Sequence, residues 1–334
     1  MKEDDIRPTG LFGEYLRLSA EDAKHYFAEE QQRLARDCPG CGGGTNKAAF
    51  KKNGFQMVNC TDCGTLFANP GPAPDRLAEF YRDSPSQKYW ANTFFPAVAA
   101  ARQEKIFRPK ATAIAELFDQ YAPKDGKVID VGAGAGLMLE ELRGAGIGRV
   151  FAAVEPTPEL ARQCRDKGFE TLEGFAEHAA EEQNFAATAA LVMSFEVIEH
   201  VVSPRAFLDD MTAMAQPGGL ILVTGLCGSG FDIQILGKSS NSVSPPHHLN
   251  FLTRQGVTHL LRRCGLEKIS FTTPGALDVD IVKAALEKDP NAFDDGFLKE
   301  MLIENDEQTL KNFQKFLTSS NLSSHMWILA RKPE

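Results

Sequence analysis

The stretch that decides the fold is VIDVGAGAGLMLEEL, residues 128–142. An apolar run enters three glycines at alternate positions, and a pattern typical of a helix follows them. Glycines at such a turn let the backbone approach a ligand at the N-terminus of the helix. The stretch therefore predicts a nucleotide-binding turn between a strand and a helix.

The spacing of the glycines discriminates between nucleotides. A dinucleotide fingerprint needs its third glycine at the sixth position, where this chain has Leu137. Asp130 stands just ahead of the turn, where a carboxylate would repel a pyrophosphate but attract a cation. S-adenosylmethionine carries an ammonium group and a sulfonium and no phosphate, so it fits this pattern. Glu155 ends the next apolar run, roughly 20 residues after the turn, a separation that places an acidic side chain on ribose hydroxyls.

Strand patterns and helix patterns alternate around this turn. Such alternation predicts a parallel, doubly wound α/β sheet. We expect strands at residues 127–131, 149–155, 169–174, 189–195, 217–225 and 265–273, and a closing strand at 323–332. Residues 278–318 have the pattern of a helical insertion, and residues 225–253 form a long loop of the kind that is usually functional.

Four of the seven cysteines form two pairs, Cys38 with Cys41 and Cys60 with Cys63. Each pair encloses two residues, and 18 residues separate the pairs, so four thiolates can converge on one tetrahedral zinc. A site of this kind is closed to further ligands, and the zinc is therefore expected to be structural.

The chain accordingly divides into three expected parts. An N-terminal helix and zinc ribbon occupy residues 1–70, a helical cap rich in aromatic residues occupies 71–122, and the nucleotide-binding domain with its helical insertion occupies 123–334. The Pro-rich stretch NPGPAPD, residues 69–75, separates the ribbon from the cap.

Composition and charge limit the choice of partners. The chain has 334 residues, of which 43% are apolar and 24% charged, as in ordinary globular proteins. The net charge of -9 argues against a nucleic-acid partner and favours small substrates. The acidic start MKEDDIRPTG lacks the pattern of a secretion signal, and no apolar run approaches the ~20 residues of a membrane helix. We therefore expect a cytoplasmic protein without a membrane partner, and the sequence predicts no oligomeric state.

Taken with FEVIEHV, residues 195–201, these features resemble class I S-adenosylmethionine-dependent methyltransferases over roughly Val128 to Lys332. The resemblance implies a Rossmann-like sheet of seven strands with the last one antiparallel. Asp130 and the glycines would meet the methionine end of the cofactor, Glu155 the ribose, and Phe175 the adenine. The full implied cofactor site is Asp130, Gly132, Ala133, Gly134, Gly136, Glu155, Phe175, Ala176 and Phe195. The chain lacks the Asp or Asn that the family often has just after the third strand.

The order of zinc ribbon, aromatic cap and core is also similar to that in sugar C-methyltransferases, which act on nucleotide-linked deoxysugars. Those enzymes carry a further C-terminal domain, which we expect 334 residues to be too few to hold. That resemblance implies a small polar acceptor, namely a nucleotide-linked sugar or glycan precursor, and a histidine base. His247 and His248 lie in the long loop after the fifth strand, on the side where parallel sheets bind ligands. Because histidine is the natural base near neutral pH, these two are the candidates for removing the acceptor's proton.

Three alternatives stay open. Glu196, Glu199 and His200 resemble the metal-binding motif of ubiquinone-type O-methyltransferases and small-RNA 2'-O-methyltransferases, although the same letters line the pocket floor in metal-free enzymes. An RNA methyltransferase that grips its substrate with the ribbon is a second alternative, and a non-enzymatic zinc module with a nucleotide-sensing domain is a third. Four cap residues either close over the ligands or pack in the core, namely Tyr81, Tyr89, Trp90 and Arg102.

Overall fold

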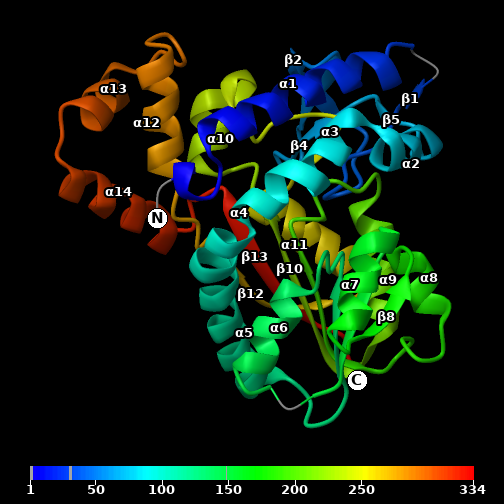
Figure 1. Cartoon of the computed structure of the whole chain (residues 1–334). Coiled ribbons are helices and arrows are strands. Elements are labelled where there is room, and N and C mark those ends of the chain that lie inside the picture. Colours follow the sequence, from blue (N-terminus) through cyan, green and yellow to red (C-terminus); the bar gives the residue numbers. More distant parts are fainter. Residues whose placement is uncertain (1–2, 30–31, 148) are drawn as a thin grey trace. The chain divides into compact units, whose positions relative to one another are not determined.

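The structure, a computed structural model, describes residues 3–29, 32–147 and 149–334 (Figure 1). Its contacts divide the chain into two compact units. The first, called the ribbon unit, comprises Met1–Ala99, Leu226–Val257 and Thr272–Met326, and the second, called the sheet unit, comprises Ala100–Gly225, Thr258–Phe271 and Trp327–Glu334. The long loop and the helical insertion thus group with the ribbon. The three-part division at residues 70 and 122 follows sequence motifs and stays a prediction.

The sheet unit contains seven strands in the order β12-β13-β10-β9-β6-β7-β8. The strands are β6 (Lys127–Val131), β7 (Phe151–Glu155), β8 (Glu170–Glu173), β9 (Ala189–Phe195), β10 (Ala215–Leu226), β12 (Glu267–Thr272) and β13 (His325–Arg331). The neighbours from β10 to β8 are parallel. The Gly218 N–H, near the start of β10, donates to the Lys332 carbonyl just beyond the end of β13, which shows that β13 runs antiparallel to β10. The predicted doubly wound, Rossmann-like sheet with an antiparallel last strand is confirmed.

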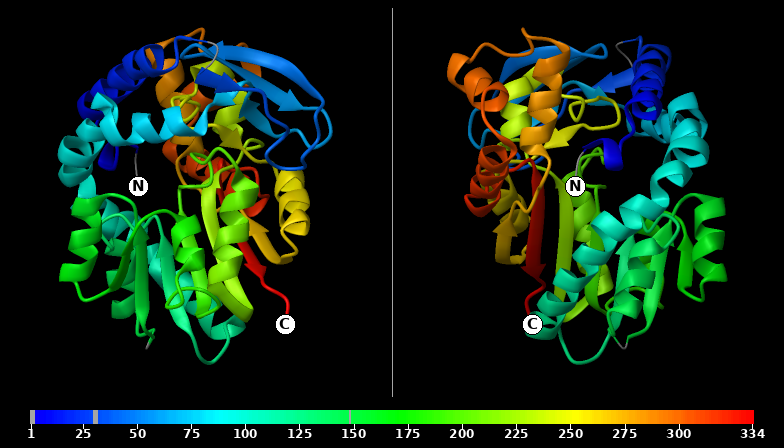
Figure 2. Two further views of the ribbon diagram at one scale, coloured as in Figure 1. Left: turned by 90° about the vertical axis from the view of Figure 1, so that its right-hand side faces the viewer. Right: turned by 60° about the vertical axis from the view of Figure 1, so that its left-hand side comes forward.

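Helices cover this sheet because its central strands are apolar on both faces (Figure 2). Every residue of β7 is buried, and Leu139 of α6 packs in the same core as Val128, Leu191 and Leu222. The helices are α5 (Arg108–Tyr121), α6 (Leu137–Gly144), α7 (Pro158–Asp166), α8 (Ala176–Glu181), α9 (Pro204–Met214) and α11 (Arg254–Arg263). A π-helical turn, Gln103–Phe107, leads into α5.

The ribbon unit is built on a four-stranded antiparallel sheet in the order β11-β4-β3-β2. Its strands are β2 (Asn46–Lys52), β3 (Phe55–Cys60), β4 (Leu66–Ala68) and β11 (Asn250–Phe251), and a separate pair joins β1 (Arg33–Leu34) to β5 (Gly71–Pro72). The hairpin between β2 and β3 turns at Asn53 and Gly54, whose φ angles of 48° and 78° suit a two-residue turn. β11 belongs to the long loop, so the loop contributes a strand to the ribbon.

The remaining helices lie in two parts of the sequence, before β6 and after β10, and all belong to the ribbon unit except the last turn of α4. They are α1 (Thr9–Tyr26), α2 (Pro74–Asp83), α3 (Pro85–Tyr89), α4 (Phe95–Arg102), α10 (Phe231–Leu236), α12 (Asp278–Lys288), α13 (Gly296–Ile303) and α14 (Glu307–Ser319). Helices α12 to α14 occupy the expected insertion and enclose an apolar cluster around Val282, Leu302 and Leu317. Among the described residues, no helix combines the length and the apolar character needed to cross a membrane.

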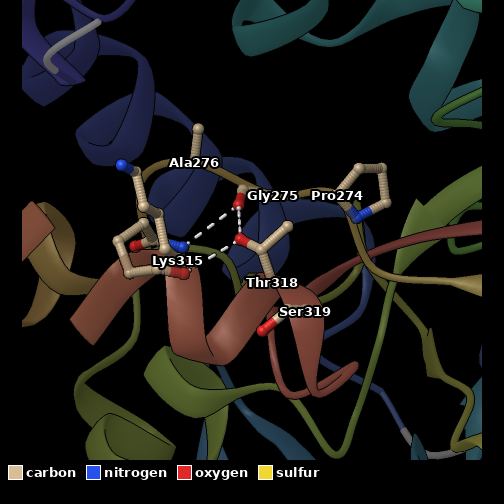
Figure 3. A pocket seen from close by; sticks show the side chains of 7 residues that line it. Pro274, Gly275, Ala276, Lys315, Thr318 and Ser319 are labelled. Atoms are coloured by element: carbon tan, nitrogen blue, oxygen red, sulfur yellow. Dashed lines mark hydrogen bonds between the residues drawn. The ribbon is translucent and has the colours of Figure 1, made fainter. Parts of the chain in front are cut away.

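A buried polar network ties α12 and α14 to the start of β13. It borders an open hollow lined by Pro274, Gly275, Ala276, Gln314, Lys315, Thr318 and Ser319 (Figure 3). Thr318 Oγ1 and Gln314 Nε2 donate to the Gly275 carbonyl at 2.8 and 3.1 Å. Asp278 accepts from Gln314 Nε2, from Ser323 Oγ and from the Ser324 N–H at 2.6 to 2.8 Å. These donors satisfy the buried carboxyl group of Asp278.

Asp232 is a second carboxyl group in the same interior. Its side chain is fully buried, and neither carboxyl oxygen has a hydrogen-bond partner among the described residues. Burial, followed by the negative charge of Asp278, raises the pKa of Asp232 to about 7. The folded protein therefore retains a proton on Asp232 at a pH where the unfolded chain has released it.

We expect Asp232→Asn to change how stability depends on pH. The raised pKa stabilises the fold below the unfolded value near 4, and this contribution is lost as the pH rises through about 7. Between pH 4 and pH 8 the variant should therefore gain stability relative to the parent, by up to about 4 kcal/mol. Denaturant unfolding of both proteins across this pH range measures the difference. A stability difference that does not vary with pH would contradict the raised pKa.

Candidate functional site

The predicted glycine turn joins β6 to α6 in the sheet unit. Gly132, Gly134 and Gly136 have φ angles of 79°, 56° and 73°, in the left-handed region where other residues are strained. A Cβ at Gly132 would lie 2.8 Å from Val197 Cγ2, and one at Gly136 would lie 3.1 Å from Cys164 Sγ. At Gly134 a Cβ would meet nothing within 4 Å. The turn is thus packed against Val197 and Cys164 at Gly132 and Gly136 and open at Gly134.

Two acidic side chains stand at this turn, as the sequence predicts. Glu155, at the end of β7, accepts from the Gly134 N–H at 2.8 Å and from the Thr157 N–H at 2.9 Å. Asp130 is 2% exposed, and its Oδ1 has no hydrogen-bond partner among the described residues. Burial, followed by the charge of Glu155, raises the pKa of Asp130 to about 8. Because an orphaned buried carboxyl oxygen is costly, a cationic ligand group at this position would stabilise it.

The other predicted cofactor residues follow the neighbouring strands. Ala133 lies in the turn, and its N–H donates to the Val154 carbonyl of β7. Phe175 is 50% exposed just after β8, whereas Ala176 is buried at the start of α8. The exposure of Phe175 argues against a role in the core and leaves an aromatic face for a flat base. Phe195 ends β9 and is half-buried.

A charged cluster lies at the carboxyl end of β9. Glu196 has a φ of 55°, unusual for a non-glycine residue, and its N–H donates to the Thr224 carbonyl of β10. Its Oε1 accepts from the Thr224 hydroxyl at 2.5 Å and lies 3.5 Å from Lys110 Nζ. Lys110 comes from α5, and its burial lowers its pKa while Glu196 opposes that shift. Backbone strain of this kind concentrates at functional sites.

Glu199 lies behind this cluster and is 1% exposed. Its Oε2 has no hydrogen-bond partner among the described residues, and burial, followed by the charge of Glu196, raises its pKa well above the ordinary value. A Cβ on Gly225 would lie 2.6 Å from Glu199 Oε2, so the glycine leaves room for this carboxyl group. Glu199 and His200 offer ligand atoms within 4.8 Å of each other, a spacing compatible with a shared cation.

His247 belongs to the ribbon unit and is 1% exposed. Its Nδ1 lies 2.9 Å from Gln87 Nε2 and its Nε2 lies 3.3 Å from Ser86 Oγ. Since the amide nitrogen can only donate, Nδ1 accepts and Nε2 carries the proton in the neutral ring. The rings of Phe80 and Tyr15 pack on it at 4.8 and 5.3 Å between centroids. His247 is therefore held by the interior of the ribbon unit on several sides.

His248 is the more accessible of the two histidines, being half-buried. Its Nδ1 lies 2.5 Å from the Ser242 carbonyl. A carbonyl can only accept, so Nδ1 donates and Nε2 is the basic nitrogen of the neutral ring. The loop thus fixes the tautomer that a general base needs.

The four predicted metal ligands converge in the ribbon unit. The sulfur atoms of Cys38, Cys41, Cys60 and Cys63 all lie within 4.8 Å of one another. The Cys38–Cys63 and Cys41–Cys60 sulfur distances are both 3.5 Å. Tetrahedral zinc with Zn–S bonds of ~2.3 Å separates its sulfurs by ~3.8 Å, so the cluster fits one zinc ion.

The cap residues lie among other aromatic groups. Tyr81 donates to the His247 carbonyl at 3.1 Å, and Tyr89 donates to the Leu11 carbonyl at 3.3 Å. Trp90 lies 4.9 Å from the ring of Tyr15. Arg102, the last residue of α4, belongs to the sheet unit. Whether the cap closes over a ligand stays a prediction.

Several side chains of these sites carry no signal in the sequence. Lys110 is one lysine on an amphipathic helix, and Thr224 is one residue of a buried strand. Cys164, whose thiol donates to the Gly134 carbonyl at 3.2 Å, resembles any core cysteine in the sequence. Only the folded sheet brings these residues beside the motifs that the sequence reveals.

Comparisons with known proteins agree with this geometry. The family model described as a methyltransferase domain matches residues 102–270. A ubiquinone biosynthesis O-methyltransferase of Methylocella silvestris is 33% identical over 114 residues, which are 32% of this chain and 44% of that protein. Another from Xylella fastidiosa is 24% identical over 212 residues, covering 58% of this chain and 82% of that protein. The chain thus spans less than half of the first of these relatives.

Solved structures similar to parts of this chain were also found. A SAM-dependent methyltransferase from Archaeoglobus fulgidus has a TM-score of 0.43 at 15% identity, covering 67% of this chain and 94% of that one. A geranyl diphosphate C-methyltransferase from Streptomyces coelicolor has a TM-score of 0.42 at 12% identity, covering 66% of this chain and 76% of that one.

Proposed function

The chain belongs to the methyltransferase domain family, and from this premise we propose that it transfers the methyl group of S-adenosylmethionine to a small polar acceptor, a nucleotide-linked sugar or glycan precursor. The observation that carries the proposal is the pair of acidic side chains at the glycine turn. Asp130 has an orphaned oxygen where an ammonium group would bind, and Glu155 is fixed against Gly134. Both oxygens of Glu155 retain lone pairs for ribose hydroxyls.

The cofactor would supply a methyl group on a positively charged sulfur, and the protein's part is to position the acceptor and take its proton. We propose that Nε2 of His248 accepts the proton that the acceptor loses, because the Ser242 carbonyl holds Nδ1 as the protonated ring nitrogen. The loop that carries His248 follows β10 directly, and ligands of such sheets bind at the carboxyl ends of the strands. His247, bonded at both ring nitrogens, would support the loop rather than react.

We further propose that Cys38, Cys41, Cys60 and Cys63 bind one structural zinc. Support comes from the convergence of the four sulfurs and from the tight turns at Gly42 and Gly64, whose φ angles are 80° and 72°. An RNA-binding ribbon is less well supported, since Lys52, one of its few cations, donates to the Ser240 carbonyl within the protein.

A second candidate function is metal-dependent O-methylation. The proximity of Glu199 and His200 favours it, as do the relatives named ubiquinone biosynthesis O-methyltransferases. It would require Glu199 to bind the ion as a carboxylate, although burial raises the pKa of this group. The acceptor itself can be identified by mass spectrometry of small molecules that stay bound through gentle purification, with a nucleotide-linked sugar expected under the first proposal and a phenolic compound under the second.

Binding of S-adenosylhomocysteine tests the cofactor assignment. Calorimetry should show binding to the parent and no tight binding of NAD. Glu155→Ala should weaken S-adenosylhomocysteine roughly 10- to 100-fold, because charge-assisted hydrogen bonds to the turn and the ribose are lost. The control is Glu159→Ala on α7, an exposed glutamate paired with Arg162, which should bind like the parent. Tight NAD binding without a response to S-adenosylhomocysteine would overturn the assignment.

Cofactor binding should also release a proton from Asp130. The pKa of this carboxyl group in the ligand-free protein is about 8, so it is mostly protonated at pH 7. An ammonium group beside it favours the carboxylate, and affinity should therefore rise with pH up to about 8. Calorimetry at pH 7 in phosphate and in Tris, whose ionisation enthalpies differ, should report release of up to about one proton. Asp130→Asn should abolish this release. Equal binding enthalpies in both buffers would contradict the prediction.

A further inference from the structure

The long loop is held by the ribbon on the C-terminal side of its two histidines. β11 pairs with β4 in antiparallel register, with Asn250 opposite Phe67. The Ala68 N–H donates to the Leu249 carbonyl at 3.0 Å. The residues that directly follow His248 are therefore a strand of the ribbon's own sheet.

The ribbon also holds the loop on the N-terminal side of the histidines. Lys52 Nζ, at the end of β2, donates to the Ser240 carbonyl at 2.5 Å. Asn53 Nδ2, in the hairpin turn, donates to the Pro245 carbonyl at 2.9 Å. Ser240 lies two residues before Ser242, whose carbonyl fixes the ring of His248. One hairpin thus anchors the segment that sets the tautomer.

Arg36 joins the two structures most directly. Its Nε donates to the Ala68 carbonyl of β4 at 2.9 Å, and one terminal nitrogen donates to the Leu249 carbonyl at 3.1 Å and to Asn250 Oδ1 at 2.6 Å. Burial lowers the pKa of Arg36 to about 10. A planar guanidinium bonds these three acceptors at once, which the single ammonium of lysine reproduces poorly.

The metal-bearing turn is tied to the end of the loop. Thr253 Oγ1 donates to the Cys63 carbonyl at 2.6 Å, and Gln255 Nε2 donates to the Asp62 carbonyl at 3.1 Å. A Cβ on Gly40 would lie 2.9 Å from Gly256 Cα, so the backbones of the two segments are in close contact. Hydrogen bonds to backbone carbonyls therefore join the second cysteine turn to the end of the loop.

We propose that the zinc ribbon is a positioning device for His248, with Arg36 as its principal positioning residue. This inference rests on the proposed function for the role of His248 as base. The ribbon contributes the edge of β4, the hairpin between β2 and β3 and the guanidinium group of Arg36. Together these hold the imidazole of His248 with Nδ1 donating to the Ser242 carbonyl. The β4 edge of the ribbon sheet is covered by β11, so the ribbon's interaction is with its own chain on that side.

The test uses the full-length protein and follows the loop directly. Hydrogen exchange of residues 245–253 is compared in the parent, Arg36→Met and Arg36→Lys, with zinc content measured in each. Arg17→Met is the matched control, since Arg17 is another arginine of the ribbon unit, which is exposed on α1 and pairs with Glu14 and Glu21. We expect exchange in 245–253 to accelerate roughly tenfold or more in both Arg36 variants with zinc retained. Arg17→Met should leave the exchange of this segment near the parent rate.

The imidazole provides a signature that a purely structural role would not change. With ¹⁵N-labelled histidine, nitrogen shifts in the parent should show His248 protonated at Nδ1, and shifts in Arg36→Met should move toward an average of both tautomers. Unchanged exchange and unchanged tautomer in Arg36→Met, or an equal effect in Arg17→Met, would overturn the proposal. If the parent contains no zinc, the metal site is refuted but the positioning role of Arg36 is not. If His248 proves dispensable for turnover while its tautomer still depends on Arg36, its role as base is refuted but the positioning is not.

Discussion

Replacing His248 with alanine is expected to lower turnover roughly 10²- to 10⁴-fold, the usual contribution of a general base. The reason is the fixed tautomer, which leaves Nε2 as the basic nitrogen. Affinity for S-adenosylhomocysteine should stay close to that of the parent, because the predicted cofactor residues belong to the sheet unit. The measurement is conversion of S-adenosylmethionine to S-adenosylhomocysteine with the acceptor identified from the purified protein.

The neighbouring His247 provides the control. His247→Ala removes a buried ring that bonds Ser86 and Gln87, so its main effect should be on folding, at roughly 2 to 4 kcal/mol. A stability loss in His247→Ala with a turnover loss in His248→Ala would separate the two roles. Full turnover in His248→Ala would defeat the assignment of the base.

The metal-dependent alternative gives a different pattern. Activity would disappear with a chelator, return with magnesium or manganese, and depend most on Glu196, Glu199 and His200. Zinc content must be followed during chelation, because loss of the ribbon's ion would disturb the histidine loop and imitate the same result. Rescue by a divalent ion with zinc retained would establish the second candidate function in place of the first.

The fold could be predicted from the sequence because its signals are local. The turn requires positive φ angles, which glycine adopts without strain, so the glycines themselves mark its position. Each central strand is likewise an apolar run within the sequence. Asp130 and Glu155 were predictable for the same reason, since each stands at a fixed position relative to a strand end. The spacing of the cysteine pairs is enough by itself to predict a metal site.

The rest depends on contacts between distant segments, which a single sequence does not display. Lys110 meets Glu196 only because α5 packs beside the sheet, and Arg36 meets Asn250 across more than 200 positions of the chain. The pairing of β11 with β4 had no signal either, because a two-residue strand is too short for a periodic pattern. The sequence also placed the long loop with the nucleotide-binding domain, whereas its contacts group it with the ribbon.

Removal of the zinc is expected to have the largest effect on stability. Structural zinc bound by short Cys-rich folds contributes roughly 10 to 16 kcal/mol of apparent binding free energy at neutral pH, and this becomes folding free energy when the unfolded chain lacks the site. The apolar cluster around the four cysteines is small, consisting of Cys38, Cys60, Cys63, Val58 and Phe67 with Cys41 packed against it. Three of its five buried members are the proposed zinc ligands, so this cluster has little apolar packing of its own with which to replace the ion.

Elemental analysis should therefore give about one zinc per chain for the parent and none for Cys60→Ser, because three thiolates no longer close the tetrahedron. Cys264→Ser is the matched control, since Cys264 is partly exposed and lies outside the four-cysteine cluster. Cys60→Ser should have a lower melting temperature than the parent and should lose the protection of β2, β3 and β4 against hydrogen exchange. Cys264→Ser should resemble the parent in both measurements. Because β11 depends on the edge of β4, the histidine loop should become exchangeable in the same variant, while the sheet unit keeps its affinity for S-adenosylhomocysteine. Zinc retained at full stoichiometry in Cys60→Ser, or a ribbon that stays protected without it, would contradict the assignment of the four cysteines.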